Sequence, residues 1–370
     1  MRPGMDYVLD VLRGEAIRPD IRCSEWRYAF QVAEQERVLP FFAARLRHSR
    51  ATLPDPILDD LSRAEQEMAR SSFWWTSELR GILQAFAANA LAVIPLKGPM
   101  LAERVYGGTN LRAMCDLDLL VEPQNFNAAG TLLEKLGFVP KRNPDELHLQ
   151  FLRGTTLVEL HFDVVNPMEF RFDTSAAWKR ARRREFLGQP VWQFAASDEL
   201  LLLCLHSARH HFQYLSHVLD IALALNCLTP EIDPDAYDLE STAGLCLFLF
   251  LGRAMAMHLD PLCKSGPDIR VPAKTAAHME KIADRLWAVM LEQPSLPPNW
   301  LAQHVLYFEA ETTTAGRLWW LAKDFCILAA RLTPKDFDFA AQYGVERRGL
   351  VWILRQLRLL AGLCGLRLYP

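Results

Sequence analysis

Two aspartates, Asp116 and Asp118, lie two residues apart in the stretch AMCDLDLLVEP, which otherwise has the composition of a buried strand. Because side chains alternate faces along a strand, both carboxylates are expected on one face, about 6–7 Å apart. Buried carboxylates this close repel each other unless a cation neutralises them. Mg²⁺ takes oxygen ligands and joins carboxylates to substrate phosphates, so the pair predicts a metal site. The structural alternative is a solvated edge strand.

A second stretch, TTLVELHFDVV (residues 155–165), also predicts a strand with one polar face, formed by Glu159, His161 and Asp163. Beside the first strand in one sheet, Glu159 would supply a third carboxylate. Three carboxylates around two Mg²⁺ or Mn²⁺ ions suit in-line phosphoryl or nucleotidyl transfer. Glu159 would then be a metal ligand and a proton acceptor. Asp163 is the alternative third carboxylate, and His161 is a candidate substrate contact.

The residues Lys97 and Gly98 are candidates for binding phosphate. They follow the apolar stretch LAVIPL, which predicts a strand, and precede a predicted helix. A glycine turn at the start of a helix suits a phosphate group, and the lysine adds a point charge. Arg112, just before the aspartates, is a candidate for bidentate phosphate binding. A salt bridge from Arg112 to one of the nearby acids is the structural alternative.

Two further candidate substrate contacts are His206 and His210, which are four residues apart and share a face of a predicted helix. They lack the third histidine or the Glu-x-x-His pattern of a zinc site. A polar helix face packed on the catalytic domain is the alternative to a substrate or phosphate contact.

The spacing of apolar residues predicts an α+β fold with three parts. Residues 1–90 have the three- and four-residue spacing of helices, residues 91–196 alternate short strands with helices, and residues 197–370 return to helices. We therefore expect a small mixed sheet flanked by helices on both sides, with the active site in a cleft between sheet and helices. The arginine-rich helix predicted at 347–368 suits peripheral contact with an anionic membrane, or a core helix with snorkelling arginines.

Composition limits the class of protein. With 370 residues, 51% hydrophobic and 23% charged, the chain has enough apolar residues for a large core. Its net charge of -3 argues against a long nucleic acid as partner. The eight cysteines form no Cys-x-x-Cys pair, which argues against a zinc knuckle. Several of them lie in apolar stretches as small core residues, a usage that suits a reducing cytoplasm. No apolar stretch reaches the ~18–20 residues of a membrane span, so we expect a cytoplasmic protein.

These motifs resemble a known family. The chain resembles the nucleotidyltransferase fold of the DNA polymerase β superfamily, and more narrowly a bacterial family of uncharacterised nucleotidyltransferases. The resemblance lies in the stretch LKGPMLAERVYGGTNLRAMCDLDLLVEP and in the later stretch VELHFDVV. The resemblance spans roughly residues 80–360 and places the family pattern on Lys97, Gly98, Arg112, Asp116, Asp118, Glu159 and His161. It implies magnesium-dependent transfer of a nucleoside monophosphate from an NTP, with release of pyrophosphate. The wider superfamily has Gly-Ser where this chain, like the narrower family, has Lys97-Gly98.

Two other functions stay open at this point. One is a catalytically degenerate module that binds a nucleotide or a protein on the same fold, which the missing serine favours. The other is γ-phosphoryl transfer to a small molecule. The sequence does not select among ATP, GTP, CTP and UTP, nor among a small molecule, a peptide, a protein or a tRNA as acceptor.

Overall fold

The computed structural model describes residues 2–17, 21–49, 51–141, 148–165, 172–232, 245–260, 271–292 and the single positions 263, 266, 269, 306 and 317. Residues 1–299 form one compact unit and residues 300–370 a second. All helices and strands below belong to the first unit. The predicted helix at 347–368, and with it the predicted membrane contact, lies outside the described residues.

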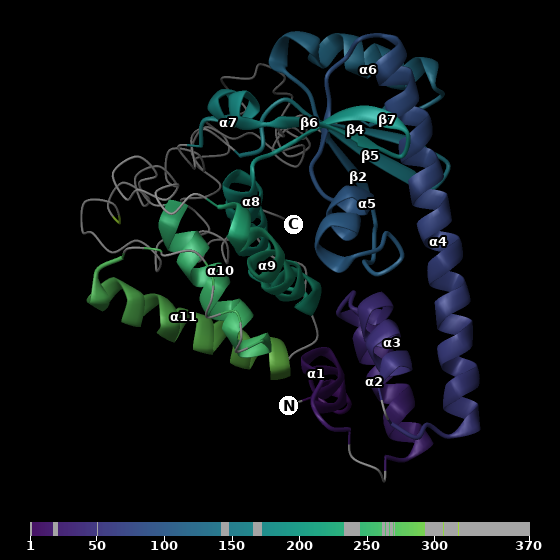
Figure 1. Ribbon diagram of the computed structural model, residues 1–370, viewed down its shortest axis with the longest axis vertical. Helices are drawn as coiled ribbons and strands as arrows, with labels where there is room; N and C mark the ends of the chain where they lie inside the picture. The colour runs from purple at the N-terminus through teal and green to yellow at the C-terminus, as the bar shows by residue number, and fades with distance from the viewer. Residues whose placement is uncertain are drawn as a thin grey trace, which may run out of the picture. The chain divides into compact units, whose positions relative to one another are not determined.

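The N-terminal part is helical, as predicted. Its four helices are α1 (Met5–Arg13), α2 (Cys23–Gln35), α3 (Leu39–His48) and α4 (Asp55–Ala88). Helix α4 runs from α2 and α3 to the sheet (Figure 1). Its buried side chains near the sheet recur every three or four residues, so one stripe of the helix faces the core. They are Trp75, Leu79, Ile82, Leu83 and Phe86.

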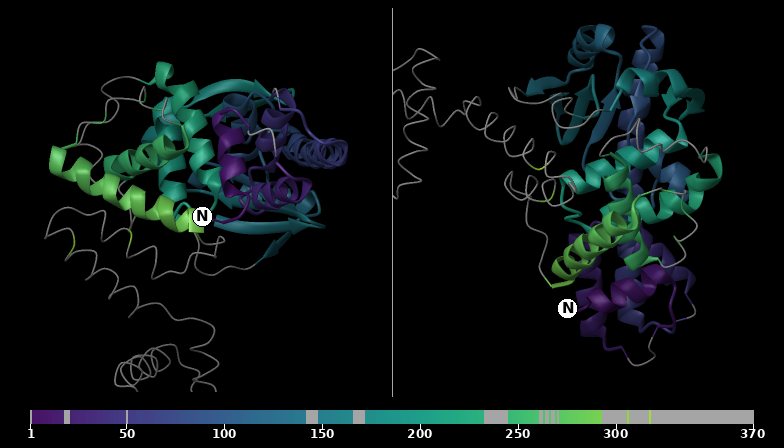
Figure 2. Two further views of the ribbon diagram at one scale, coloured as in Figure 1. Left: turned by 90° about the horizontal axis from the view of Figure 1, so that it is seen from below. Right: turned by 90° about the vertical axis from the view of Figure 1, so that its left-hand side faces the viewer.

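A five-stranded mixed sheet follows, in the order β1-β2-β5-β4-β3. The strands are β1 (Ile94–Pro95), β2 (Leu117–Leu120), β3 (Val139–Lys141), β4 (His148–Arg153) and β5 (Thr156–His161). Strands β2 and β5 run parallel, whereas every other neighbouring pair is antiparallel. The two further views of Figure 2 show this sheet with the helices around it. The predicted mixed sheet is thus confirmed, although β2 starts one residue after Asp116.

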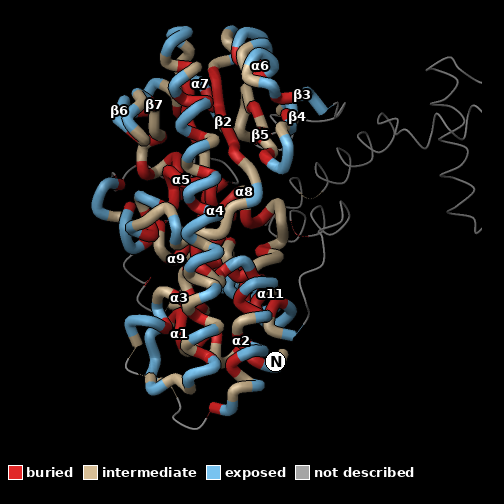
Figure 3. The backbone as a smooth tube through the Cα atoms, turned by 90° about the vertical axis from the view of Figure 1, so that its right-hand side faces the viewer, coloured by how far each residue is buried: buried red, intermediate tan, exposed pale blue. Residues whose placement is uncertain are grey.

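One face of the sheet is apolar and packs against α4 and α6 (Phe126–Lys135). The strands contribute Leu117, Leu119, Val158 and Leu160 to this core. All four residues of β2 are buried, as the red tube in Figure 3 shows. The alternation that the sequence predicts therefore leaves the acidic residues on the opposite face.

The segment from Thr174 to Gln193 contains elements that the sequence analysis missed. Helix α7 (Thr174–Arg180) precedes an antiparallel hairpin of β6 (Arg182–Phe186) and β7 (Gln189–Gln193). The arginines and glutamines of this hairpin dilute the apolar alternation that identifies a strand. The backbone N–H of Trp192 donates to the carbonyl of Val93 at 2.9 Å, which attaches the hairpin beside β1.

Helices α8 (Ala196–Arg209), α9 (Leu215–Leu228), α10 (Leu245–Leu259) and α11 (Ala273–Glu292) complete the first unit. The return to helices after residue 197 is confirmed, and the first helical stretch is divided at His211 and Phe212, which have φ of +54° and +49°. This left-handed turn separates α8 from α9. No helix within the described ranges is long and apolar enough to cross a membrane. The domain boundaries near 90 and 196 stay a prediction.

The surroundings of two glycines lead to a prediction about stability. A Cβ at Gly252 in α10 would lie 2.5 Å from Cys204 Sγ in α8, whereas nothing lies within 4 Å of one at Gly81 in α4. We expect Gly252→Ala to lower the free energy of unfolding by about 1–3 kcal/mol through overpacking. Gly81→Ala should raise it by about 0.5–1 kcal/mol through helix propensity. Urea unfolding measures both, and a loss of stability in neither variant would contradict the close packing of α10 on α8.

Candidate active site

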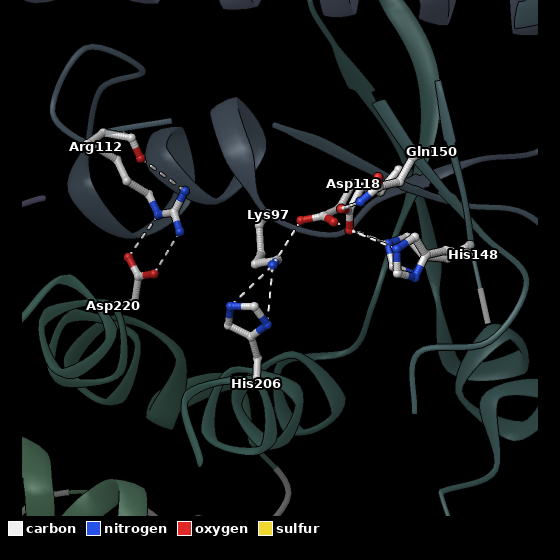
Figure 4. A network of polar contacts seen from close by, with 10 residues as sticks. Lys97, Arg112, Asp118, His148, Gln150, His206 and Asp220 are labelled. Carbon is white, nitrogen blue, oxygen red and sulfur yellow. Dashed lines mark hydrogen bonds and ion pairs between the residues drawn. The ribbon is translucent and has the colours of Figure 1, made fainter. Parts of the chain in front are cut away.

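The polar face of the sheet brings together the carboxylates that the sequence singled out. Asp118 on β2 pairs in register with Glu159 on the parallel strand β5. Asp116 immediately precedes β2, two residues before Asp118. Figure 4 shows Asp118 with side chains from the neighbouring strands on one side and Lys97 on the other. The predicted grouping of acids is therefore present in the structure.

Two groups of the protein itself contact the carboxylate of Asp118. Its side chain is 5% exposed, and Lys97 Nζ lies 2.9 Å from Oδ2. On its other oxygen, His161 Nε2 lies 3.1 Å from Oδ1. Burial raises the pKa of Asp118, but the charge of Lys97 and the hydrogen bond of His161 outweigh it and bring this pKa below its usual range. Asp118 is thus an ionised, buried carboxylate held between two cationic or donor groups.

Asp116 has the opposite electrostatic environment. Burial and the nearby charge of Asp118 raise the pKa of Asp116 to about 6, although Lys97 opposes this effect. One lysine thus faces two neighbouring acids. The negative charge of Glu159 raises the pKa of Asp116 further. Carboxylate oxygens are the donors that Mg²⁺ and Mn²⁺ take, so the donor types of these acids suit a divalent ion. Within the described ranges these three acids do not form a group whose ligand atoms all lie within 4.8 Å of one another, and their sharing of an ion stays a prediction.

Glu159 is held in place by the adjacent strand β4. Gln150 Nε2 donates to Glu159 Oε1 at 2.8 Å. The other carboxylate oxygen, Oε2, lies 3.5 Å from His148 Nε2 and 3.7 Å from His161 Nε2. Sequence analysis missed both Gln150 and His148. Their two-residue spacing in the stretch HLQFL, just before the turn at residues 154–155, was the signal that could have found them.

The alternative third carboxylate, Asp163, lies beyond the end of β5. Its Oδ1 accepts from the backbone N–H of Val164 at 2.8 Å and from the hydroxyl of Thr174, the first residue of α7. These contacts hold the chain where it leaves the strand. The geometry therefore favours Glu159 over Asp163 as the partner of Asp118.

Lys97 connects the acids with the C-terminal helices. Its Nζ lies 3.4 Å from both ring nitrogens of His206 in α8, as well as beside Asp118. Gly98 begins α5 (Gly98–Leu101) with φ of +62°, a left-handed conformation that favours glycine. The turn that was predicted to bind phosphate thus lies next to the acids.

Arg112 forms the salt bridge that the sequence left open, but with a different acid. Its Nε and Nη2 donate to the two carboxylate oxygens of Asp220 in α9, at 2.9 and 2.8 Å. Tyr106 donates its hydroxyl to the same carboxylate at 2.5 Å. Burial lowers the pKa of Arg112, but Asp220 outweighs it and the pKa lies above its ordinary value. Phosphate binding by Arg112 stays a prediction.

His206 and His210 lie together with a third histidine, His217 in α9. The ring centroids are 4.6 Å apart for His206–His210 and 5.7 Å apart for His210–His217. The seven-residue spacing of the last pair was a usable signal, since residues seven apart share a helix face. A continuous helix would hold them about 10 Å apart along its axis, and the left-handed turn brings them closer.

This cluster predicts a pH dependence of stability. Burial lowers the pKa of both His206 and His217 well below the ordinary value in the folded protein. The unfolded chain therefore binds more protons below about pH 6.5, and stability is lost as the pH falls. We expect the stability of the wild type to fall relative to that of His217→Gln between pH 7.5 and 5, with a slope of at most about 1.4 kcal/mol per pH unit. Urea unfolding across this range measures it, and a constant difference would contradict the burial of His217 as a neutral imidazole.

The comparison with protein-family models agrees with the resemblance of the motifs. The sequence model of a family described as uncharacterised nucleotidyltransferase matches residues 22–259, a range that contains every candidate residue above. No curated protein matches the chain. Among solved structures, the chain is similar to an antigenic nucleotidyltransferase-like protein from Paracoccidioides brasiliensis, with 17% identity and a TM-score of 0.39. That similarity covers 55% of this chain and 96% of the other.

Proposed function

Because the chain belongs to the family of uncharacterised nucleotidyltransferases, we propose that it transfers a nucleoside monophosphate from an NTP to an acceptor and releases pyrophosphate. One observation carries the proposal. Asp118 and Glu159 lie side by side on parallel strands, with Asp116 next to them and the Lys97 ammonium 2.9 Å from Asp118. This places acids for a divalent ion beside a cation for phosphate.

In this proposal, Asp116, Asp118 and Glu159 hold Mg²⁺ or Mn²⁺. The bound ion supplies positive charge at the triphosphate. An acceptor oxygen forms a bond to the α-phosphorus, while the bond between the α-phosphorus and the bridging oxygen breaks and its electron pair leaves with pyrophosphate. Glu159 takes the proton of an acceptor hydroxyl. Gln150 keeps the Glu159 carboxylate oriented during this step.

Lys97 exchanges partners in the proposed complex. Its ammonium now neutralises Asp118, a task that a divalent ion would take over. Lys97 and the backbone at Gly98 would then contact the triphosphate. Arg112, which precedes β2 and is held by Asp220 of α9, contributes positive charge near Asp116. The charge of Asp116 also raises the pKa of Arg112. His161, His206 and His210 line the region where an acceptor or the nucleotide would lie.

A specific observation favours a second candidate, a nucleotide- or protein-binding module without turnover. Both oxygens of Asp118 already have partners, Lys97 and His161, so this carboxylate is satisfied without an ion. The absence of the superfamily serine at Gly98 agrees with this alternative.

A labelling experiment separates the candidates. Each of the four NTPs, labelled at the α- or the γ-phosphate, is incubated with the protein, Mg²⁺ and small-molecule, peptide, protein or tRNA acceptor fractions. Transfer of the α-label with release of pyrophosphate is the expected result. Transfer of the γ-label instead would make the protein a kinase. Magnesium-dependent binding without transfer of either label would make it a binding module.

A further inference from the structure

A group of three side chains on the polar sheet face has ligand chemistry that differs from that of the aspartate pair. Within the described ranges, His148, Glu159 and His161 are the one group of three His, Cys, Asp or Glu residues whose ligand atoms all lie within 4.8 Å of one another. We propose that these three residues form a binding site for a divalent transition-metal ion such as Co²⁺ or Zn²⁺. His148, which has no role in the nucleotidyl transfer proposed above, distinguishes this site.

The sheet register builds the group. His148 on β4 pairs with His161 on the antiparallel strand β5, and Gln150 pairs in the same way with Glu159. The side chains of these four residues lie on one face because they are two residues apart on each strand. The two imidazole rings lie 4.7 Å apart between centroids. Regular strands, rather than loops, thus position all three ligands.

The separations between the ligand atoms suit a bound ion. Glu159 Oε2 lies 3.5 Å from His148 Nε2 and 3.7 Å from His161 Nε2. Metal–nitrogen and metal–oxygen bonds of about 2.1 Å at tetrahedral angles separate neighbouring ligand atoms by about 3.4 Å. Small movements of the side chains would therefore complete the geometry.

The contacts around the group orient its ligands. Gln150 Nε2 donates to Glu159 Oε1 at 2.8 Å, which leaves Oε2 directed toward the imidazoles. Such outer hydrogen bonds to a carboxylate ligand are a usual part of metal sites. Asp118 Oδ1 lies 3.1 Å from His161 Nε2. An ion that takes His161 Nε2 would release this oxygen of Asp118, which then becomes available as a fourth ligand.

The donor types determine the class of ion. Imidazole nitrogen binds Zn²⁺, Co²⁺ and other transition ions well, whereas Mg²⁺ prefers oxygen donors only. Two histidines with one carboxylate and open positions are typical of transition-metal sites. The aspartate pair, with oxygen donors only, keeps its preference for Mg²⁺ or Mn²⁺. The strand face would then hold two ions of different chemical class.

A metal titration without nucleotide tests the site directly. Co²⁺ is titrated into protein without a histidine tag, and binding is followed by its visible absorption, which changes when imidazole nitrogen enters the coordination shell. We expect one Co²⁺ per chain, displaced by Zn²⁺. His148→Gln should weaken binding at least about 100-fold, since even outer partners of a metal ligand contribute 10–100-fold.

His210→Gln is the matched control, because it removes a histidine from the other cluster. It should leave the Co²⁺ affinity within about threefold of the wild type. Unchanged Co²⁺ binding in His148→Gln, or loss of binding in His210→Gln alone, would overturn the proposal. Thermal unfolding shows whether the variants are folded, because their melting temperatures should equal that of the metal-free wild type. Zn²⁺ should raise the melting temperature of the wild type but not that of His148→Gln.

The proposed metal site and the proposed nucleotidyl transfer share Glu159. The inference rests on the proposed function only in this respect, because the shared residue would place the bound ion beside the nucleotide. Binding of Co²⁺ and transfer of an α-labelled nucleotide are measured separately. Transfer without Co²⁺ binding at His148 overturns the metal site and leaves the proposed function intact. Co²⁺ binding without transfer supports the metal site and overturns the proposed function.

Discussion

Asp118→Asn is expected to lower the rate of pyrophosphate release at least about 1,000-fold, equivalent to about 4 kcal/mol of transition-state stabilisation. The carboxylate is buried, pairs in register with Glu159 and is the contact of Lys97 and His161. Asparagine keeps the shape of the side chain but removes the negative charge that would hold a divalent ion. Release of pyrophosphate from the NTP that transfers its α-label measures the effect.

Asp163→Asn is the matched control for this prediction. It makes the same chemical change in an acid near the end of β5, where the carboxylate contacts Val164 and Thr174. We expect its rate of pyrophosphate release to stay within about threefold of the wild type. A larger loss in Asp163→Asn than in Asp118→Asn would show that the wrong carboxylate has been assigned.

The largest effect on stability is expected from Asp220→Ala, which should lower the free energy of unfolding by about 3–5 kcal/mol. The Asp220 side chain is 5% exposed and that of Arg112 15%. The substitution would leave a largely buried guanidinium, and the hydroxyl of Tyr106, without their shared acceptor. A buried charge without a partner destabilises the folded protein far more than a buried ion pair stabilises it.

Asp60, an acid near the surface whose side chain is 23% exposed, provides the control. Its partner Arg27 is 59% exposed, so Asp60→Ala should change the free energy of unfolding by less than about 1 kcal/mol. The double substitution Asp220→Leu with Arg112→Met should recover most of the loss, because it removes both charges together. Urea unfolding measures all three variants. Equal effects of Asp220→Ala and Asp60→Ala would contradict the burial of the Arg112–Asp220 pair.

The faces of the strands could be predicted from the sequence because they depend on local alternation. Leu117 and Leu119 pack in the apolar core, and Asp118 lies on the other face, as a period of two requires. The N-terminal helices followed from the spacing of apolar residues in the same way. Both features depend on residues only a few positions apart in the chain, so the spacing of apolar residues predicts them without knowledge of the fold.

The pairings between distant residues could not be predicted in this way. Arg112 and Asp220 are 108 residues apart, and only the packing of α9 brings them together. The break between α8 and α9 lies at His211 and Phe212, where no glycine or proline signals the positive φ of the turn. Long-range packing therefore determined the parts of the site that the sequence left out.

The predicted partner of Lys97 shows how the two sources combine. From the sequence, Lys97 is expected to contact phosphate, and the neighbouring aspartates are expected to need a cation that neutralises them. In the structure the ammonium lies 2.9 Å from Asp118. The lysine therefore supplies that cation in the protein without ligand, and the phosphate contact stays a prediction for the complex.

The central claim is that the acids of the strand face bind a metal-bound triphosphate. Calorimetric titration of each of the four NTPs, with and without Mg²⁺, into the wild type and the double variant Asp116→Asn/Asp118→Asn tests it most directly. We expect one NTP to bind in a Mg²⁺-dependent manner and this binding to be lost in the double variant. Binding of equal strength in the two proteins, or in the presence and absence of Mg²⁺, would contradict it.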